Sequence, residues 1–159
     1  MKNKGLLVCV LVTLVGLLTL SLAAAAGDPF SGTWKMNAEK SKYSPGPAPK
    51  DVTVVIECDE SNYKIDATGT GGDGKPLHVQ YSAKFDGKDY PVTGVANADS
   101  ISVKRIDAST IETVQKKDGK VVMTVTSKVS KDGKTRTSTW RGKNSEGKDV
   151  HNVVVFEKQ

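Results

Sequence analysis

The side chains with the widest chemical repertoire are few and far apart in this sequence. His78 and His151 are its two histidines, and Cys58 is the one cysteine after residue 26. Histidines and cysteines together can bind zinc, and a histidine beside a hydroxyl or thiol can activate it as a nucleophile. Zinc ligands usually come in closely spaced pairs, and these three residues do not. We therefore expect no metal site.

No catalytic motif accompanies these residues. The sequence has no nucleophile elbow, no phosphate-binding loop and no paired metal-ligand motif. His78 and His151 both alternate with apolar neighbours, so we expect both to point outward from their strands. We predict that the protein is not an enzyme and that it uses no cofactor.

Arginine is the rarer cation, with three residues against twenty lysines, so its positions are informative. Arg105 continues the face of Ile101 and Val103, and Arg141 follows Trp140 near the end of a predicted strand. A guanidinium that reaches a cavity can hold an anionic ligand through two parallel hydrogen bonds. Two of the three arginines are therefore candidates for binding an anion.

An arginine stem can also pack on an aromatic ring. For Arg105 and Arg141 we favour this structural role, with Trp34 as the ring. Arg136 lies close to a predicted turn at Asp132, and we expect it to be solvated.

The first 26 residues have the pattern of a signal peptide. Two lysines near the start precede an uncharged segment from Gly5 to Leu22, and Ala24 and Ala26 are the small residues that a cleavage site needs. An uncleaved membrane anchor is the alternative, since the apolar segment is near the lower length limit for a span. In either case we expect the rest of the chain to be exported, periplasmic or extracellular, with no membrane span after cleavage.

Residues 27–159 have the composition of one β-domain. Cleavage would remove two lysines and no acid, so the formal net charge would fall from +5 to +3. Leu77 is the one leucine in this range, whereas valine, threonine, isoleucine and tyrosine are frequent. Apolar and polar residues alternate from Asp51 onward, which predicts about ten strands and no long helix. Alternating prolines between 45 and 49 predict an extended connection.

Five turns of one kind separate the predicted strands. Each has an acidic residue followed by Gly-Lys, and Asp-Gly favours the left-handed turn that joins antiparallel strands. A calcium site is the alternative, but no copy has the oxygen ligands and closing glutamate of a calcium-binding loop. The turns therefore predict a meander of hairpins. They begin at Asp73, Asp86, Asp118, Asp132 and Glu146.

A meander of this length has two unpaired edges, and closure into a barrel removes both. We predict an all-β, antiparallel, up-and-down barrel of about ten strands. A barrel of eight strands is filled by its own side chains, so a larger one should contain a cavity. Ordinary core packing is the alternative that we favour for the apolar residues facing inward. The candidate ligand-binding residues are Tyr81, Phe85, Val103, Arg105, Met123, Arg141 and Phe156.

The two ends of residues 27–159 resemble those of the calycin superfamily. Gly32-Thr33-Trp34 looks like the Gly-x-Trp of lipocalins, whereas the strand number, the length and the ending Val155 to Lys158 look more like fatty-acid-binding proteins. The chain resembles, within this superfamily, the exported lipocalin-like proteins of bacteria. The resemblance implies that a small hydrophobic molecule, such as a lipid, binds inside the barrel. It also implies that Gly32 and Trp34 close the base, with a basic side chain of a late strand against Trp34.

Two features depart from the fatty-acid-binding proteins. They have a helical pair between their first two strands, where this chain has the proline-spaced connection. They hold the fatty-acid carboxylate with Arg-x-Tyr on the last strand, where this chain has Val154 and Phe156. Lipocalin disulfides and the C-terminal helix are missing too. We therefore do not expect that carboxylate anchor here.

The expected function is that of an exported, monomeric, non-enzymatic binding protein for a small hydrophobic or amphipathic molecule. The alternative is a structural or protein-interaction module, a barrel or a β-sandwich, with a filled core. Nucleic-acid binding would need basic and aromatic residues clustered on one face. The lysines are spread along the chain and aromatic residues make up 6% of it, so we expect no nucleic-acid partner.

Overall fold

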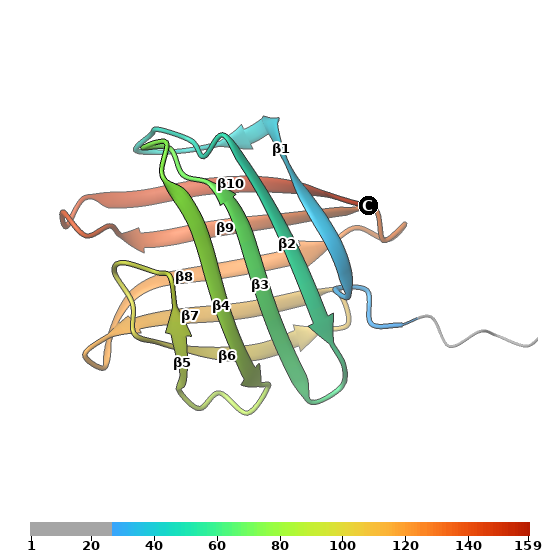
Figure 1. Cartoon of the computed structure of the whole chain (residues 1–159). Helices are drawn as coiled ribbons and strands as arrows, with labels where there is room; N and C mark the ends of the chain where they lie inside the picture. Colours follow the sequence, from blue (N-terminus) through green and yellow to red (C-terminus); the bar gives the residue numbers. More distant parts are fainter. Residues whose placement is uncertain (1–26) are drawn as a thin grey trace, which may run out of the picture.

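A computed structural model describes residues 27–159 as an all-β protein (Figure 1). The predicted signal peptide, 1–26, lies outside the described residues. Within 27–159 no helix is long and apolar enough to cross a membrane. The strands are β1 (Gly32–Lys42), β2 (Asp51–Cys58), β3 (Asn62–Thr70), β4 (Pro76–Lys84), β5 (Tyr90–Thr93), β6 (Ser100–Asp107), β7 (Thr110–Lys117), β8 (Lys120–Val129), β9 (Thr135–Lys143) and β10 (Asp149–Lys158).

The strands form a closed barrel in which each strand pairs antiparallel with its neighbours in sequence. The first strand closes the ring, because Trp34 pairs with Val54 of β2 on one side and with Lys158 of β10 on the other. The predicted ten-stranded up-and-down barrel is therefore confirmed. In Figure 1, β1–β4 cross in front of β6–β10, and the core lies between these two layers.

The five predicted turns all connect consecutive antiparallel strands. Their glycines have φ values between 69° and 81°, a region that residues with a Cβ atom rarely adopt. In three of the turns the aspartate also accepts a hydrogen bond from the backbone N–H of the lysine two residues later, at 3.0–3.1 Å. The predicted hairpins are confirmed, and the local turn chemistry explains them.

The base of the barrel is closed around a tryptophan. Phe30 and Trp34 are both fully buried, and the Trp34 indole N–H donates a hydrogen bond to the Phe30 carbonyl at 2.8 Å. The Lys158 Nζ atom lies 5.1 Å from the centre of the Trp34 ring and donates to the Pro29 carbonyl. Gly32 has a φ of 125°, and a Cβ atom there would be 2.9 Å from the Lys158 Cε atom. This position therefore requires a glycine.

The wall is shortest at β5, which is four residues long. Only two residue pairs join β5 to β4, and only two join it to β6. The connection after β5 packs directly on β4, since a Cβ atom on Gly94 would collide with the backbone carbonyl of His78. Next to β4, the barrel wall is therefore formed by β5 together with the connection that follows it.

Candidate functional site

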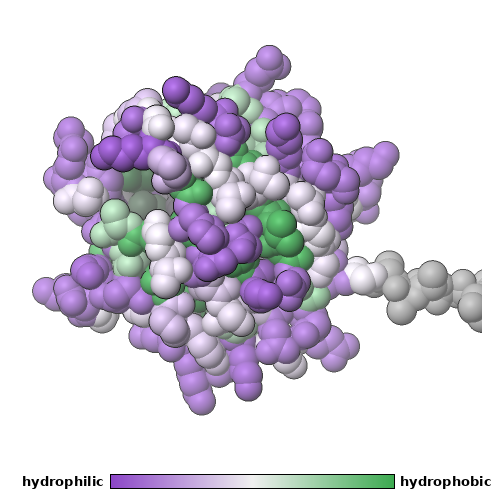
Figure 2. All heavy atoms as spheres, viewed as in Figure 1, coloured by the Kyte–Doolittle hydropathy of each residue, from purple (hydrophilic) through white to green (hydrophobic). Residues whose placement is uncertain are grey.

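The barrel encloses a cavity of about 390 Å³. Pockets for small ligands usually have volumes of about 300–1,000 Å³. The cavity reaches the β1–β2 connection at Tyr43 and Pro49 and the β5–β6 connection at 94–96. These connections lie at the end away from Phe30, because β1 runs from the base towards them. In Figure 2, polar side chains cover much of the outer surface and apolar ones show in the hollows between them.

The two layers of the barrel line this cavity with different side chains. The layer of β2–β4 contributes mainly aliphatic side chains, whereas β7–β9 contribute mainly polar ones, with Val125 as an apolar exception. We call these surfaces the apolar wall and the polar wall. The apolar wall comprises Val52, Val54, Ile65, Ala67, Leu77 and Val79, and the polar wall comprises Thr113, Gln115, Ser127, Arg136, Ser138 and Trp140.

Arg136 is the one charged side chain among the described residues that line the cavity. It is 4% exposed, and its guanidinium carbon lies 4.2 Å from the centre of the Phe156 ring and 5.7 Å from that of Trp34. Among residues 27–159 it has no ion-pair partner, and its Nε and Nη2 atoms have no hydrogen-bond partner. Burial lowers the pKa of Arg136 from its usual value, but arginine keeps its proton in proteins. The cavity therefore contains a positive charge that the described residues do not neutralise.

The prediction that Arg136 is solvated is wrong. Its strand alternates in and out, so Arg136, Ser138 and Trp140 share the inner face of β9. The sequence contained this signal, because an aromatic residue four positions along the same strand points to the same side. The same two-residue period places Arg141 outside, next to Trp140 but on the opposite face.

The remaining polar groups on β8 and β9 differ in whether they have a hydrogen-bond partner. The hydroxyls of Ser127 and Ser138 are 2.8 Å apart and hydrogen-bond to each other. The indole N–H of Trp140 is buried and has no partner among the described residues. Two side chains of the polar wall, Arg136 and Trp140, therefore have buried N–H groups that the described residues leave free.

Two tyrosines face the same space and remain neutral. Burial raises the pKa of Tyr63 to about 12 and also raises the pKa of Tyr81. The phenol groups can therefore donate hydrogen bonds at physiological pH, but they cannot supply a negative charge to Arg136. This leaves the cavity with a net positive charge.

The structure does not bring the seven candidate ligand-binding residues together. Tyr81 and Phe156 line the cavity. Met123 and Arg141 line a separate surface pocket of about 560 Å³ at the ends of β8, β9 and β10. The other three candidates lie elsewhere in the barrel: Val103 is fully buried in the core, and Phe85 and Arg105 contact each other near the base.

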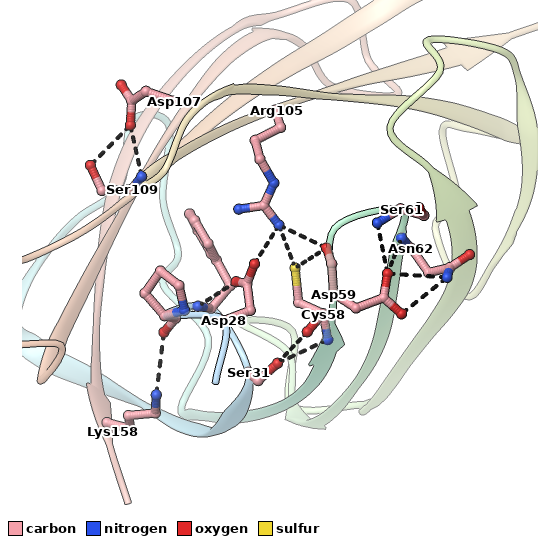
Figure 3. A network of polar contacts seen from close by, with 12 residues as sticks. Asp28, Ser31, Cys58, Asp59, Ser61, Asn62, Arg105, Asp107, Ser109 and Lys158 are labelled. Carbon is pink, nitrogen blue, oxygen red and sulfur yellow. Dashed lines mark hydrogen bonds and ion pairs between the residues drawn. The ribbon is translucent and has the colours of Figure 1, made fainter. Parts of the chain in front are cut away.

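Arg105 belongs to a network at the base of the barrel (Figure 3). Its Nη2 atom donates to the Asp28 carboxylate at 2.6 Å, to the Cys58 sulfur at 3.0 Å and to the Asp59 carbonyl at 3.1 Å. The guanidinium carbon is also 4.4 Å from the centre of the Phe85 ring. Arg105 therefore ties the segment before β1 to the β2–β3 turn.

Neither of the two arginines considered for covering Trp34 does so. Arg105 contacts Phe85, and Arg141 is exposed, whereas the cations near the Trp34 ring are Lys158 and Arg136. The resemblance implied a basic side chain of a late strand against Trp34, and both Lys158 on β10 and Arg136 on β9 are on late strands.

The histidines and the cysteine lie outside the cavity lining. His78 is exposed and lies 3.1 Å from the Asp66 carboxylate, and His151 is exposed beside the surface pocket. Burial, followed by the nearby Asp28, raises the pKa of the Cys58 thiol to about 12. Within 27–159, no group of three or more His, Cys, Asp or Glu side chains is placed to hold a metal ion.

In comparisons with known proteins, no protein-family model matches this chain and no curated protein does. The closed ten-stranded antiparallel barrel is compatible with a calycin-like fold.

Proposed function

We propose that this protein is an exported, non-enzymatic binding protein of calycin-like type, and that it holds a small amphipathic anion inside the barrel. The observation that carries the proposal is the buried guanidinium of Arg136, which lies without a counter-charge in a cavity large enough for a small molecule. The signal-peptide pattern of residues 1–26 supports export.

The energetics of Arg136 support an anionic ligand. An uncompensated buried charge is costly, and buried charges are normally paired. Its contacts with the Phe156 and Trp34 rings recover part of this cost. The N–H groups that lie in the plane of the guanidinium, however, cannot donate hydrogen bonds to these rings. A carboxylate, sulfonate or phosphate group can accept two of these N–H groups at once. The ligand would then supply the partner that the fold leaves out.

The rest of the cavity supports an apolar body on that ligand. Aliphatic side chains of β2–β4 face Arg136 across the barrel, and burying an alkyl chain against them is favourable by about 0.8 kcal/mol per methylene group. This anchor differs from the Arg-x-Tyr of fatty-acid-binding proteins, because Arg136 is on β9 and not on the last strand.

The proposal is tested by native mass spectrometry of protein purified from its own host, followed by displacement of an anionic lipophilic fluorophore with dodecanoate. We expect a bound small molecule, or an empty protein that binds the fluorophore and releases it to dodecanoate. An empty barrel that binds neither compound would contradict the proposal and favour a structural or protein-interaction module.

A further inference from the structure

The polar wall places two unsatisfied donor groups at two positions along one strand. Arg136 and Trp140 are four residues apart on the inner face of β9, which corresponds to about 13 Å at the usual rise per residue of a strand. The Arg136 Nε and Nη2 atoms and the Trp140 Nε1 atom are all buried and lack a partner among the described residues. A buried donor without an acceptor is costly, so both positions favour a ligand that supplies one.

The polar side chain between these two donors already has a hydrogen-bond partner. Ser138 lies between them on the same face, and its hydroxyl is already paired with Ser127 of β8. Thr113 and Gln115 of β7 extend the polar wall to the side, whereas the wall opposite is aliphatic. A ligand in this cavity therefore lies beside a side chain with an unpaired charged donor near the base, beside one with an unpaired neutral donor further out, and against apolar side chains on the other side.

We propose that the ligand has two polar ends: an acidic group that binds Arg136, and a hydrogen-bond acceptor that binds the indole N–H of Trp140. The apolar part between them packs on the β2–β4 side. This inference rests on the proposed function and narrows it, because a simple fatty acid offers a partner to Arg136 but none to Trp140. The ligand class is a hydroxylated or oxygenated amphipathic acid.

The test compares dodecanoate with ω-hydroxydodecanoate in the fluorophore-displacement assay. Both have the same chain and acidic group, and only the second carries an oxygen at its far end. A hydroxyl that enters an apolar site loses its hydrogen bonds with water, which normally weakens binding about tenfold or more. We expect the opposite here, namely that the wild-type protein binds the hydroxy acid at least as tightly as dodecanoate.

Trp140→Phe removes the indole N–H and keeps an aromatic ring. We expect it to weaken binding of the hydroxy acid by about five- to tenfold and to change dodecanoate binding by less than about twofold. Arg141→Gln, which alters the outward neighbour on the same strand, is the matched control and should change neither affinity. Thermal melts establish that both variants are folded. If Trp140→Phe does not fold, the ratio of the two wild-type affinities still decides the question.

The outcomes separate the two proposals. If both acids bind but the hydroxy acid binds about tenfold more weakly and Trp140→Phe has no effect, the two-ended ligand is ruled out and the binding function stands. If neither acid displaces the fluorophore and the fluorophore itself does not bind, the binding function fails, and this inference fails with it.

Discussion

Two arginines point into this barrel, and their surroundings differ. Arg105, near the base, has one free Nε atom, but its Nη2 atom reaches a carboxylate, a sulfur and a carbonyl. Arg136, in the cavity, has aromatic rings as neighbours and no counter-charge among the described residues. Breaking a buried pair lowers stability because it leaves one charge uncompensated, whereas a charge that the fold itself leaves unpaired lowers stability from the start and can be compensated by a ligand.

The largest effect should come from emptying the base. We expect Trp34→Ala to lower the free energy of unfolding by about 3–5 kcal/mol, the usual range for removing a buried aromatic side chain. Trp140→Ala is the control, and it should cost less because Trp140 is only partly buried beside an existing cavity. Denaturant melts measure both. A loss of less than about 1 kcal/mol for Trp34→Ala would show that the base does not depend on this ring.

Replacing the unpaired arginine should move stability and binding in opposite directions. Arg136→Met keeps an unbranched apolar stem and removes the charge, so we expect the empty protein to become more stable by about 1–3 kcal/mol. The affinity for dodecanoate should fall by at least about tenfold, since a charge-assisted hydrogen-bond pair is lost. Arg141→Met changes an exposed arginine of the same strand and should alter neither quantity. If Arg136→Met is less stable than wild type and binds dodecanoate equally well, Arg136 is not the unpaired, ligand-binding arginine of this comparison.

Breaking the paired arginine should affect stability alone. Asp28→Asn keeps the shape of the side chain but removes the counter-charge of Arg105, so we expect a loss of about 1–2 kcal/mol in denaturant melts. Asp149→Asn disrupts a highly exposed pair with Lys143 and should leave the stability close to that of wild type. Dodecanoate affinity should not change in either variant. A weakened affinity in Asp28→Asn alone would show that the base and the cavity are coupled.

The smallest effect concerns the thiol next to Arg105. Because the pKa of Cys58 is raised to about 12, we expect iodoacetamide to alkylate it at pH 8 at least about tenfold more slowly than a free thiol. Asp28→Asn should speed the reaction, because Asp28 helps to raise this pKa and Arg105 acts to lower it. Mass spectrometry of the Cys58 peptide measures both rates. A wild-type rate equal to that of a free thiol would show that Cys58 is not shielded.

The same pKa shift predicts how stability depends on alkaline pH. Folding raises the pKa of Cys58 from its ordinary value of 9.0 to about 12, so the folded state holds this proton more tightly than the unfolded state. The stabilising contribution is complete below about pH 9 and is lost as the pH rises towards 12. Melts of Cys58→Ser should show a shallower decline over this interval than wild type. An identical decline would show that Cys58 does not contribute to the loss of stability.

The fold could be predicted from the sequence because its signals are local. Period-two alternation and the acid-Gly-Lys turns specify strands and hairpins within a few residues, and closure follows from the need to pair both edges. The sequence also indicates that Arg136 points inward. It precedes Ser138 by two residues and Trp140 by four, so all three side chains lie on the same face of β9. The nearby turn at Asp132 carries no information about which face of β9 Arg136 occupies.

The site could be predicted only in part, because its composition depends on which faces meet across the barrel. Arg105 and Asp28 are separated by 77 positions, and no local pattern indicates that they pair. Tyr81 and Phe156 were placed on the correct face, but Phe85, also assigned to an inner face, lies nearer the base than the cavity does. Alternation gives the face of a residue, whereas the depth along the barrel depends on strand tilt and register.

The most direct measurement is the affinity of the wild-type protein for dodecanoate compared with uncharged dodecanol, by displacement of the same fluorophore. If Arg136 binds the acidic group, the acid should bind at least about tenfold more tightly than the alcohol, and Arg136→Met should abolish this preference. Equal affinities of the wild-type protein for the two compounds would contradict a role for the unpaired guanidinium in binding.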